Sequence, residues 1–205
     1  MKTITAIEAQ KRGKGRFNVF CDGAFVFSLN REVVEKQGLH VGQMLSDSQI
    51  EELVGADLFA RCLNTALRLL SYRPRSEAEI RGRLSRRFDA ETIDRVILHL
   101  KASQMIDDAA FAQFWRENRE SFRPCGKRLL RWELKGKGVA SEVIDEVLDG
   151  IKDEESAYRA AQRRARTLDK DYETFRRKLG AFLGRRGFSY GVINSTIERL
   201  WREIS

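Results

Sequence analysis

The sequence is poor in the side chains that hold metal ions, with two histidines and three cysteines among 205 residues. Cys21, Cys62 and Cys125 are odd in number and lie far apart, and no pair has CxxC spacing. A disulfide framework and a structural zinc site are therefore both unsupported. Neither His40 nor His99 has a second candidate ligand at metal-binding spacing. We expect no bound metal and a reducing compartment.

The sequence also lacks long apolar segments. No stretch approaches the roughly 20 apolar residues that a membrane span requires, and the N-terminus has no apolar core of signal-peptide length. We therefore expect a cytoplasmic protein that makes no membrane contact.

Catalytic motifs are missing as well. There is no Walker-type glycine loop and no GxSxG motif. The adjacent carboxylates Asp107 and Asp108 stand just before the apolar segment 109–112, a position typical of a helix N-cap and a first-turn acid. We expect no catalytic residue, no cofactor and no enzymatic activity.

Positive charge is what the sequence has in excess. Lys and Arg outnumber Asp and Glu by 38 to 30, which gives a net charge of +8 and a pI near 9.6. Residues 1–59 carry 7 bases and 8 acids, whereas residues 60–205 carry 31 bases and 22 acids. An excess of this kind is typical of proteins that approach a polyanion, and it belongs to the second region only.

The first part of the chain has the pattern of a small β-rich module. Apolar residues alternate with others on both sides of Asp22-Gly23, which predicts two strands joined by a two-residue hairpin turn. Asn30 is suited to begin a short helix. Ser46 and Gln49 form a capping box, at which another helix should begin.

From about residue 60 the apolar residues follow helical spacing, and the pattern repeats about every 50 residues. Each repeat contains an apolar pair at i, i+4 and, about ten residues later, a stripe at i, i+3, i+4, i+7. The pairs are Ile80 and Leu84, Leu130 and Leu134, and Leu179 and Leu183, and the stripes begin at Ile93, Ile144 and Ile193. Segments 60–72, 111–122 and 156–168 supply a first helix, so each repeat should hold three helices.

These patterns predict a protein that is all-α in the main, with tandem three-helix repeats in an elongated arrangement behind a small N-terminal β-hairpin module. The expected domains are the β-rich module at 1–59 and repeats at 60–109, 110–155 and 156–205.

Basic residues recur in phase with the repeat. A base stands three residues after the second apolar residue of each pair, at Arg87, Lys137 and Arg186. In the second repeat three bases four residues apart stack on one helix face, which we expect to lie opposite the leucine pair. We call this set, Lys127, Arg131 and Lys135, the basic ridge. The candidate binding residues are Arg73, Arg75, Arg86, Arg87, Lys127, Arg128, Arg131, Lys135, Lys137, Arg176, Arg185 and Arg186.

Two interpretations of these bases are open. One is a surface that binds phosphates or an acidic protein groove. The other is a set of solvated helix faces, which is the usual place of charge on helices. Trp115, Trp132 and Trp201 are expected to pack within the helical core rather than to stack on nucleic-acid bases.

Two stretches of the chain resemble a known family, the RecX regulatory proteins. They are residues 106–112, which contain the paired aspartates, and residues 124–139, a basic, glycine-led helix followed by a base and a glycine. The matching residues are Arg75, Ser76, Glu79 and Leu84 in the first repeat, and Gly126, Lys127, Arg128, Arg131, Lys137 and Gly138 in the second. The family usually has glycine at the positions of Gln104 and Arg87, where this chain departs from it.

The resemblance implies a fold of tandem three-helix repeats and a partner. RecX proteins bind the RecA recombinase filament on DNA, lie along its groove and limit its ATP hydrolysis and strand exchange in recombination, DNA repair and the SOS response. By this resemblance we expect a non-enzymatic regulator of RecA without a cofactor. We also expect a monomer that binds single- or double-stranded DNA more weakly by itself.

A helix-turn-helix protein that reads duplex DNA directly is the alternative from a different class. It requires side chains such as Asn, Gln or Arg at the start of a recognition helix. The third helices begin instead at residues 89–92, 140–143 and 188–191, and two of these starts carry acids where phosphates would lie. An accessory nuclease or ligase would need clustered carboxylates or histidines, which we do not find.

Overall fold

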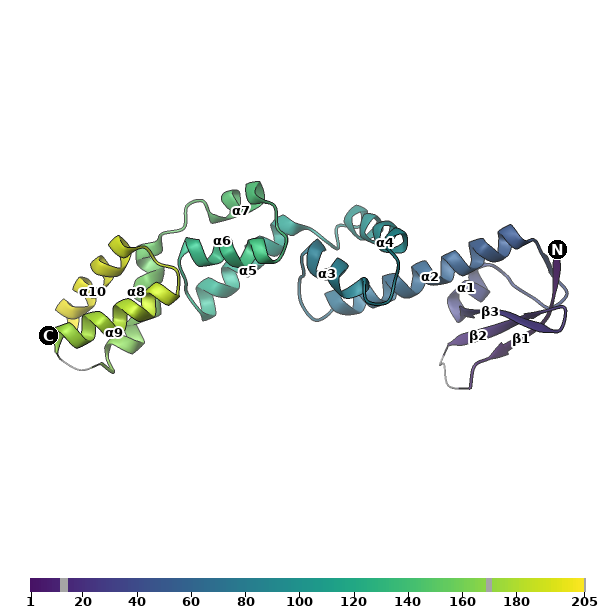
Figure 1. Cartoon of the computed structure of the whole chain (residues 1–205), viewed down its shortest axis with the longest axis horizontal. Coiled ribbons are helices and arrows are strands. Elements are labelled where there is room, and N and C mark those ends of the chain that lie inside the picture. Colours follow the sequence, from purple (N-terminus) through teal and green to yellow (C-terminus); the bar gives the residue numbers. More distant parts are fainter. Residues whose placement is uncertain (12–14, 169–170, 205) are drawn as a thin grey trace. The chain divides into compact units, whose positions relative to one another are not determined.

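The structure, a computed structural model, describes residues 1–11, 15–168 and 171–204. The chain divides into an N-terminal unit of residues 1–71 and 83–100 and a C-terminal unit of residues 72–82 and 101–205. Among the described residues there are four strands and ten helices (Figure 1). The expected fold, mainly helical with a small N-terminal β module, is confirmed.

The predicted hairpin is part of a four-stranded antiparallel sheet in the order β3-β2-β1-β4. The strands are β1 (Lys2–Ala9), β2 (Arg16–Cys21), β3 (Ala24–Asn30) and β4 (Met44–Leu45). Between β2 and β3 the turn residues Asp22 and Gly23 have φ values of 50° and 83°, which is the conformation that a two-residue hairpin needs. The fourth strand is only two residues long and was not predicted.

Helices α1 (Arg31–Lys36) and α2 (Asp47–Leu70) pack with the sheet. Both halves of the capping box at the start of α2 are present, since Ser46 Oγ accepts from the Gln49 amide and Gln49 Oε1 accepts from the Ser46 amide. The helix then continues without interruption past residue 60. The expectation of a separate helix at 60–72 was therefore wrong, because nothing in the segment between them ends the first helix.

Asp57, in the middle of α2, ties that helix to the sheet. Its carboxylate is buried and accepts hydrogen bonds from the Asn30 amide at 2.6 Å and from the Arg16 guanidinium at 3.2 Å. Helix α4 (Ala90–Ala102) carries the first predicted stripe, and Ile93, Leu100 and the apolar residues between them in the stripe are all buried.

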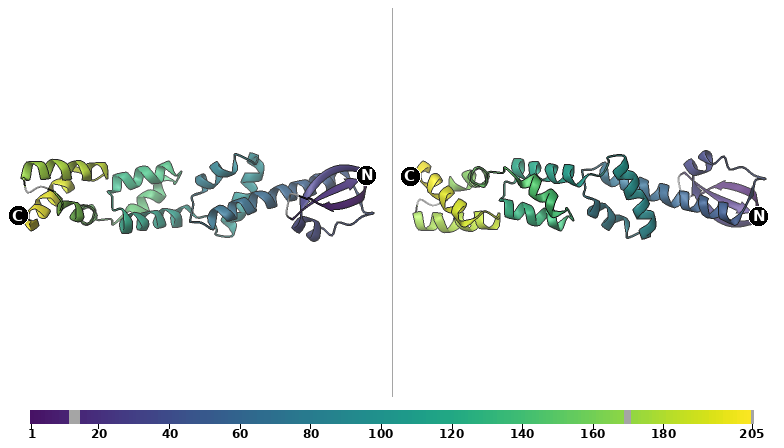
Figure 2. Two further views of the ribbon diagram at one scale, coloured as in Figure 1. Left: turned by 90° about the horizontal axis from the view of Figure 1, so that it is seen from below. Right: turned by 90° about the horizontal axis from the view of Figure 1, so that it is seen from above.

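The C-terminal unit contains two three-helix groups, which Figure 1 labels and Figure 2 shows from two further directions. One group is α5 (Asp108–Phe122), α6 (Lys127–Gly136) and α7 (Ser141–Leu148), and the other is α8 (Asp153–Ala165), α9 (Tyr172–Arg185) and α10 (Tyr190–Ile204). Each group has its own apolar core, and both contain the leucine pair predicted for them. Helix α3 (Glu77–Leu84) begins in this unit.

Successive repeats meet in this unit at two equivalent contacts, which we call the first and second junctions. At the first junction the start of α3 lies against the turn after α6, where Ser76 Oγ donates to the Lys137 carbonyl at 2.6 Å. At the second junction the start of α6 lies against the turn after α9, where the Gly126 amide donates to the Arg186 carbonyl at 2.9 Å. The acceptor in both cases is the carbonyl just before the turn glycine, whereas the donor is a side-chain hydroxyl at the first junction and a backbone amide at the second.

Each junction depends on a glycine in the turn. Gly138 and Gly187 have φ values of +76° and +80°, which side chains disfavour. They also lie too close to the facing helix for a side chain, because an added Cβ would come within 2.4 Å of Ala78 Cβ at the first junction and within 2.6 Å of Leu129 Cβ at the second. Glycine is therefore needed for two independent reasons.

At each junction the helix start is capped by an aspartate that begins a later helix, Asp108 of α5 and Asp153 of α8. Asp108 Oδ1 accepts from the Glu77 amide at 2.9 Å, and Asp153 Oδ1 accepts from the Lys127 amide at 3.0 Å. Burial raises the pKa of both carboxyl groups. Asp107, as predicted, caps its own helix, whereas the role of Asp108 at another helix could not be seen in the sequence.

Replacing Gly187 by alanine should lower the free energy of unfolding by about 2–4 kcal/mol, because the methyl group adds backbone strain and a contact below van der Waals distance. Gly184, in α9, has open space around its Cβ position and provides the control. Gly184→Ala should stabilise the protein by about 0.5–1 kcal/mol. Urea unfolding measures both, and equal effects of the two substitutions would contradict the close approach.

Candidate functional site

The candidate bases fall into groups with different surroundings. Three lie at the junctions: Arg73, Lys137 and Arg186. Six are exposed: Arg86, Arg87, Arg128, Lys135, Arg176 and Arg185. Arg75, Lys127 and Arg131 are partly exposed. The twelve residues therefore differ in their surroundings, and their role in binding stays a prediction.

At the first junction two bases share one carboxylate. Glu79 receives two hydrogen bonds from the Arg73 guanidinium, at 2.9 and 3.0 Å, and one from Lys137 Nζ at 2.8 Å. Lys137 Nζ also lies 4.1 Å from the centre of the Trp115 ring, and only 18% of its side chain is exposed. The contacts of Lys137 within the described chain thus give it a structural role.

The charge balance at Glu79 sets its ionisation. Burial would by itself raise the pKa of the Glu79 carboxyl, but the hydrogen bonds and positive charges of Arg73 and Lys137 outweigh burial and lower the pKa to about 2. The carboxylate therefore stays ionised at neutral pH and holds the two bases together.

Arg186 occupies the place of Lys137 at the second junction. Its Nη1 donates to the Pro124 carbonyl at 2.8 Å, and its guanidinium carbon lies 4.6 Å from the centre of the Phe182 ring. The base that recurs three residues after each leucine pair therefore makes contacts within the fold at both junctions. Arg87, the equivalent base of the first repeat, is exposed.

We expected the basic ridge to lie opposite the two buried leucines of α6, but it lies beside them. Successive residues turn about 100° around a helix, which places the ridge about a quarter turn from the leucines. Lys127 and Arg131 are accordingly partly buried, and Lys135 is exposed. Arg131 forms an ion pair with Asp145 of α7, in which both side chains are well exposed.

The outward face of α6 carries Trp132, whose side chain is 73% exposed. Arg128 stands one turn before it and Lys135 one turn after it, and both are exposed. We had predicted that Trp132 packs in the core, and this was wrong. Its position two residues after Leu130, nearly opposite on the helix, was the signal that could have revealed its exposure.

The other two tryptophans pack as expected. Trp115 Nε1 donates to Glu133 at 2.7 Å, and the ring of Trp201 lies 5.1 Å from that of Phe175 in the core of α8, α9 and α10. Arg128, Trp132 and Lys135 together form what we call the exposed face of α6.

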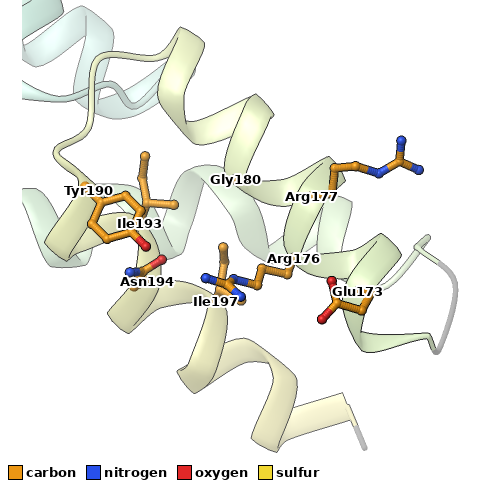
Figure 3. Close-up of a pocket in the computed structure, with 8 residues that line it drawn as sticks. All are labelled: Glu173, Arg176, Arg177, Gly180, Tyr190, Ile193, Asn194 and Ile197. Carbon is orange, nitrogen blue, oxygen red and sulfur yellow. The ribbon is translucent and has the colours of Figure 1, made fainter.

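Arg176 borders a separate cleft of about 450 Å³ between α9 and α10. In Figure 3 its side chain reaches from α9 towards Asn194 and Ile197 of α10, while Arg177 points away. Tyr190 also lines the cleft, and hydrogen bonds with Asn194 and Arg176 lower the pKa of its phenol. Arg185, on the same helix, does not line this cleft.

Within residues 1–11, 15–168 and 171–204, no group of three or more His, Cys, Asp or Glu side chains is arranged to hold a metal ion. Within the same described ranges, no helix has both the length and the apolar character needed to cross a membrane.

A small sheet followed by tandem three-helix groups, with basic residues both at the junctions and on an outward helix face, defines a helical-repeat protein. Four family descriptions match the chain in this order. Residues 2–46 match the regulatory protein RecX N-terminal domain, and residues 62–100, 107–148 and 152–197 match the first, second and third three-helix domains of RecX.

Relatives and solved structures agree with these matches. A regulatory protein RecX of Clostridium perfringens is 32% identical over 98% of this chain and 97% of its own length, and one of Clostridioides difficile is 29% identical over 98% and 96%. A crystal structure of regulatory protein RecX, 29% identical, superimposes with a TM-score of 0.69 over 97% of this chain and all of the other. RecX from Lactobacillus salivarius gives a TM-score of 0.62 at 25% identity, over 71% of this chain and 97% of the other. The chain belongs to the RecX family.

Replacing Glu79 by glutamine should lower the free energy of unfolding by about 2 kcal/mol at pH 7, because Arg73 and Lys137 then face each other without a carboxylate. The pKa of Glu79 is lower in the folded chain, about 2, than in the unfolded chain, about 4.3. The stabilisation is therefore complete above about pH 5 and is lost as the pH falls towards 2.

Urea unfolding of both proteins at pH 7 and pH 3 tests this, and the difference between them should be clearly smaller at pH 3. A difference of the same size at the two pH values would mean that ionisation of Glu79 does not support the junction.

Proposed function

We propose that this protein binds the RecA recombinase filament on DNA and limits its ATP hydrolysis and strand exchange, without enzymatic activity of its own. Membership of a family whose members are named regulatory proteins supports a regulatory role. In this proposal the protein acts in the cytoplasm, in recombination, DNA repair and the SOS response, as a monomer. The proposed working parts are the module at 1–59 and the repeats at 60–109, 110–155 and 156–205.

The observation that best supports a binding role is the exposed face of α6. Trp132 presents most of its side chain to solvent between two exposed bases. Tryptophan and arginine are the residue types most enriched where protein interfaces gain their affinity. Covering an exposed aromatic side chain with a partner removes its apolar surface from water, which favours binding.

The basic ridge adjoins this face and shares Lys135 with it, so four bases lie on one side of α6, and Arg131 among them is paired with Asp145. A filament of protein and nucleic acid offers both acidic side chains and phosphates to such a surface. Several weak contacts made by linked repeats along a periodic filament would add to tight binding. Inhibition then requires only that the bound protein favours one state of the filament.

Replacing both Lys127 and Arg131 by glutamate should weaken binding to the RecA filament at least about a hundredfold, because reversed charges add repulsion to the loss of attraction. The measurement is the protein concentration that half-inhibits ATP hydrolysis by RecA on single-stranded DNA. Partly exposed charges contribute only about 0–1 kcal/mol to stability, so thermal melting should show a folded double variant.

Arg163→Glu provides a matched control, since Arg163 is an exposed base on α8 outside the candidate set. It should leave the inhibition curve in place. An unchanged curve from the folded double variant would reduce the basic ridge to a solvated helix surface and would move the proposed contact to Arg176, Arg185 and Arg186.

A further inference from the structure

The two junctions are built alike but differ at one position that carries charge. Glu79, one residue before the first apolar residue of its pair, has its counterpart in Leu129, one residue before Leu130. At the first junction the Glu79 carboxylate binds Arg73 and Lys137. At the second junction the side chain at this position is that of Leu129, which carries no charge.

Both bases of the first junction recur at the second. Arg123 precedes Pro124 as Arg73 precedes Pro74, and Arg186 follows the third-repeat leucine pair as Lys137 follows the second. The second junction thus has the two positive charges, with Leu129 at the position of the carboxylate that joins them at the first.

The acidic residue beside the cavity at the second junction, Glu133, already has partners. It accepts hydrogen bonds from the Arg119 guanidinium at 2.8 and 2.9 Å and from Trp115 Nε1 at 2.7 Å. A cavity of about 230 Å³ opens here, lined by Arg119, Arg123, Cys125, Leu129, Glu133 and Arg186. Three guanidinium groups therefore face this cavity with one carboxylate among them.

The excess of positive charge around the cavity affects Arg186. Burial lowers the pKa of its guanidinium, and the positive charges of Arg123 and Arg119 lower it further. An anion placed between Arg123 and Arg186 would relieve this repulsion as Glu79 does at the first junction. Leu129 and Cys125 supply an apolar wall that suits a methylene stem.

We propose that the cavity at the second junction binds the carboxylate of an aspartate or glutamate side chain from a protein partner, held between Arg123 and Arg186. The equivalent site in the same chain is filled by a carboxylate, which favours that ligand over a nucleic-acid phosphate. Glu133 on the cavity wall also disfavours a backbone that carries a row of negative charges. The inference rests on the proposed function only for the partner's identity, which would be the protein part of the filament.

Two variants test the site in the full chain. Arg123→Gln removes one of the two bases, and Leu129→Glu supplies an internal carboxylate like that of Glu79. Each should weaken binding of a fluorescent hexaglutamate peptide about tenfold, the effect expected for one close charge pair. Arg163→Gln, an exposed base on α8, is the control and should have no effect.

A fluorescent oligothymidylate of equal charge, measured in the same buffer by anisotropy, separates carboxylate from phosphate. Its binding should change less than twofold in both variants. If the oligothymidylate weakens and the peptide does not, the site takes phosphate and the proposal is overturned. It is also overturned if neither probe responds to Arg123→Gln in a protein with normal helicity, and this variant decides the matter alone should Leu129→Glu fail to fold.

RecA is absent from this assay. A negative result would therefore not contradict the proposed regulation of the filament. Failure of that regulation would in turn not contradict the anion site.

Discussion

The close backbone approach between consecutive repeats is the constraint on which the C-terminal unit depends. At Gly138 and Gly187 the chain turns with positive φ while a neighbouring helix start packs where a side chain would be. Only glycine satisfies both conditions without strain. The contact then brings a helix start, a base and the aspartate that begins a later helix into one place, so that Asp108 of α5 caps α3 and Asp153 of α8 caps α6.

This constraint separates the basic residues into two kinds. Lys137 and Arg186 stand next to the junction glycines, and their side chains bind groups of the neighbouring repeat. Arg128 and Lys135 point outward on α6 beside Trp132 and are available to a partner. Recurrence of charge in phase with a repeat is therefore evidence of a repeated environment, which can be a junction as well as a binding surface.

Much of the fold could be predicted because it depends on local pattern. The leucine pairs, the capping box at Ser46 and the hairpin at Asp22 all follow from residues close in sequence. The contact of Lys137 with Glu79 joins residues 58 positions apart, and no local signal distinguishes it from an exposed base. The residue type of Gln104 also gives no sign of its φ of 54°, a left-handed conformation that glycine adopts more readily.

In the proposed function the protein recognises the assembled RecA filament rather than either component alone. The most direct measurement is co-sedimentation with RecA assembled on single-stranded DNA, beside free RecA and bare DNA at the same concentrations and salt. We expect the protein to sediment with the filament at concentrations at which it binds free RecA and bare DNA much less. Equal binding to bare DNA and to the filament would contradict it and would leave a DNA-binding protein in its place.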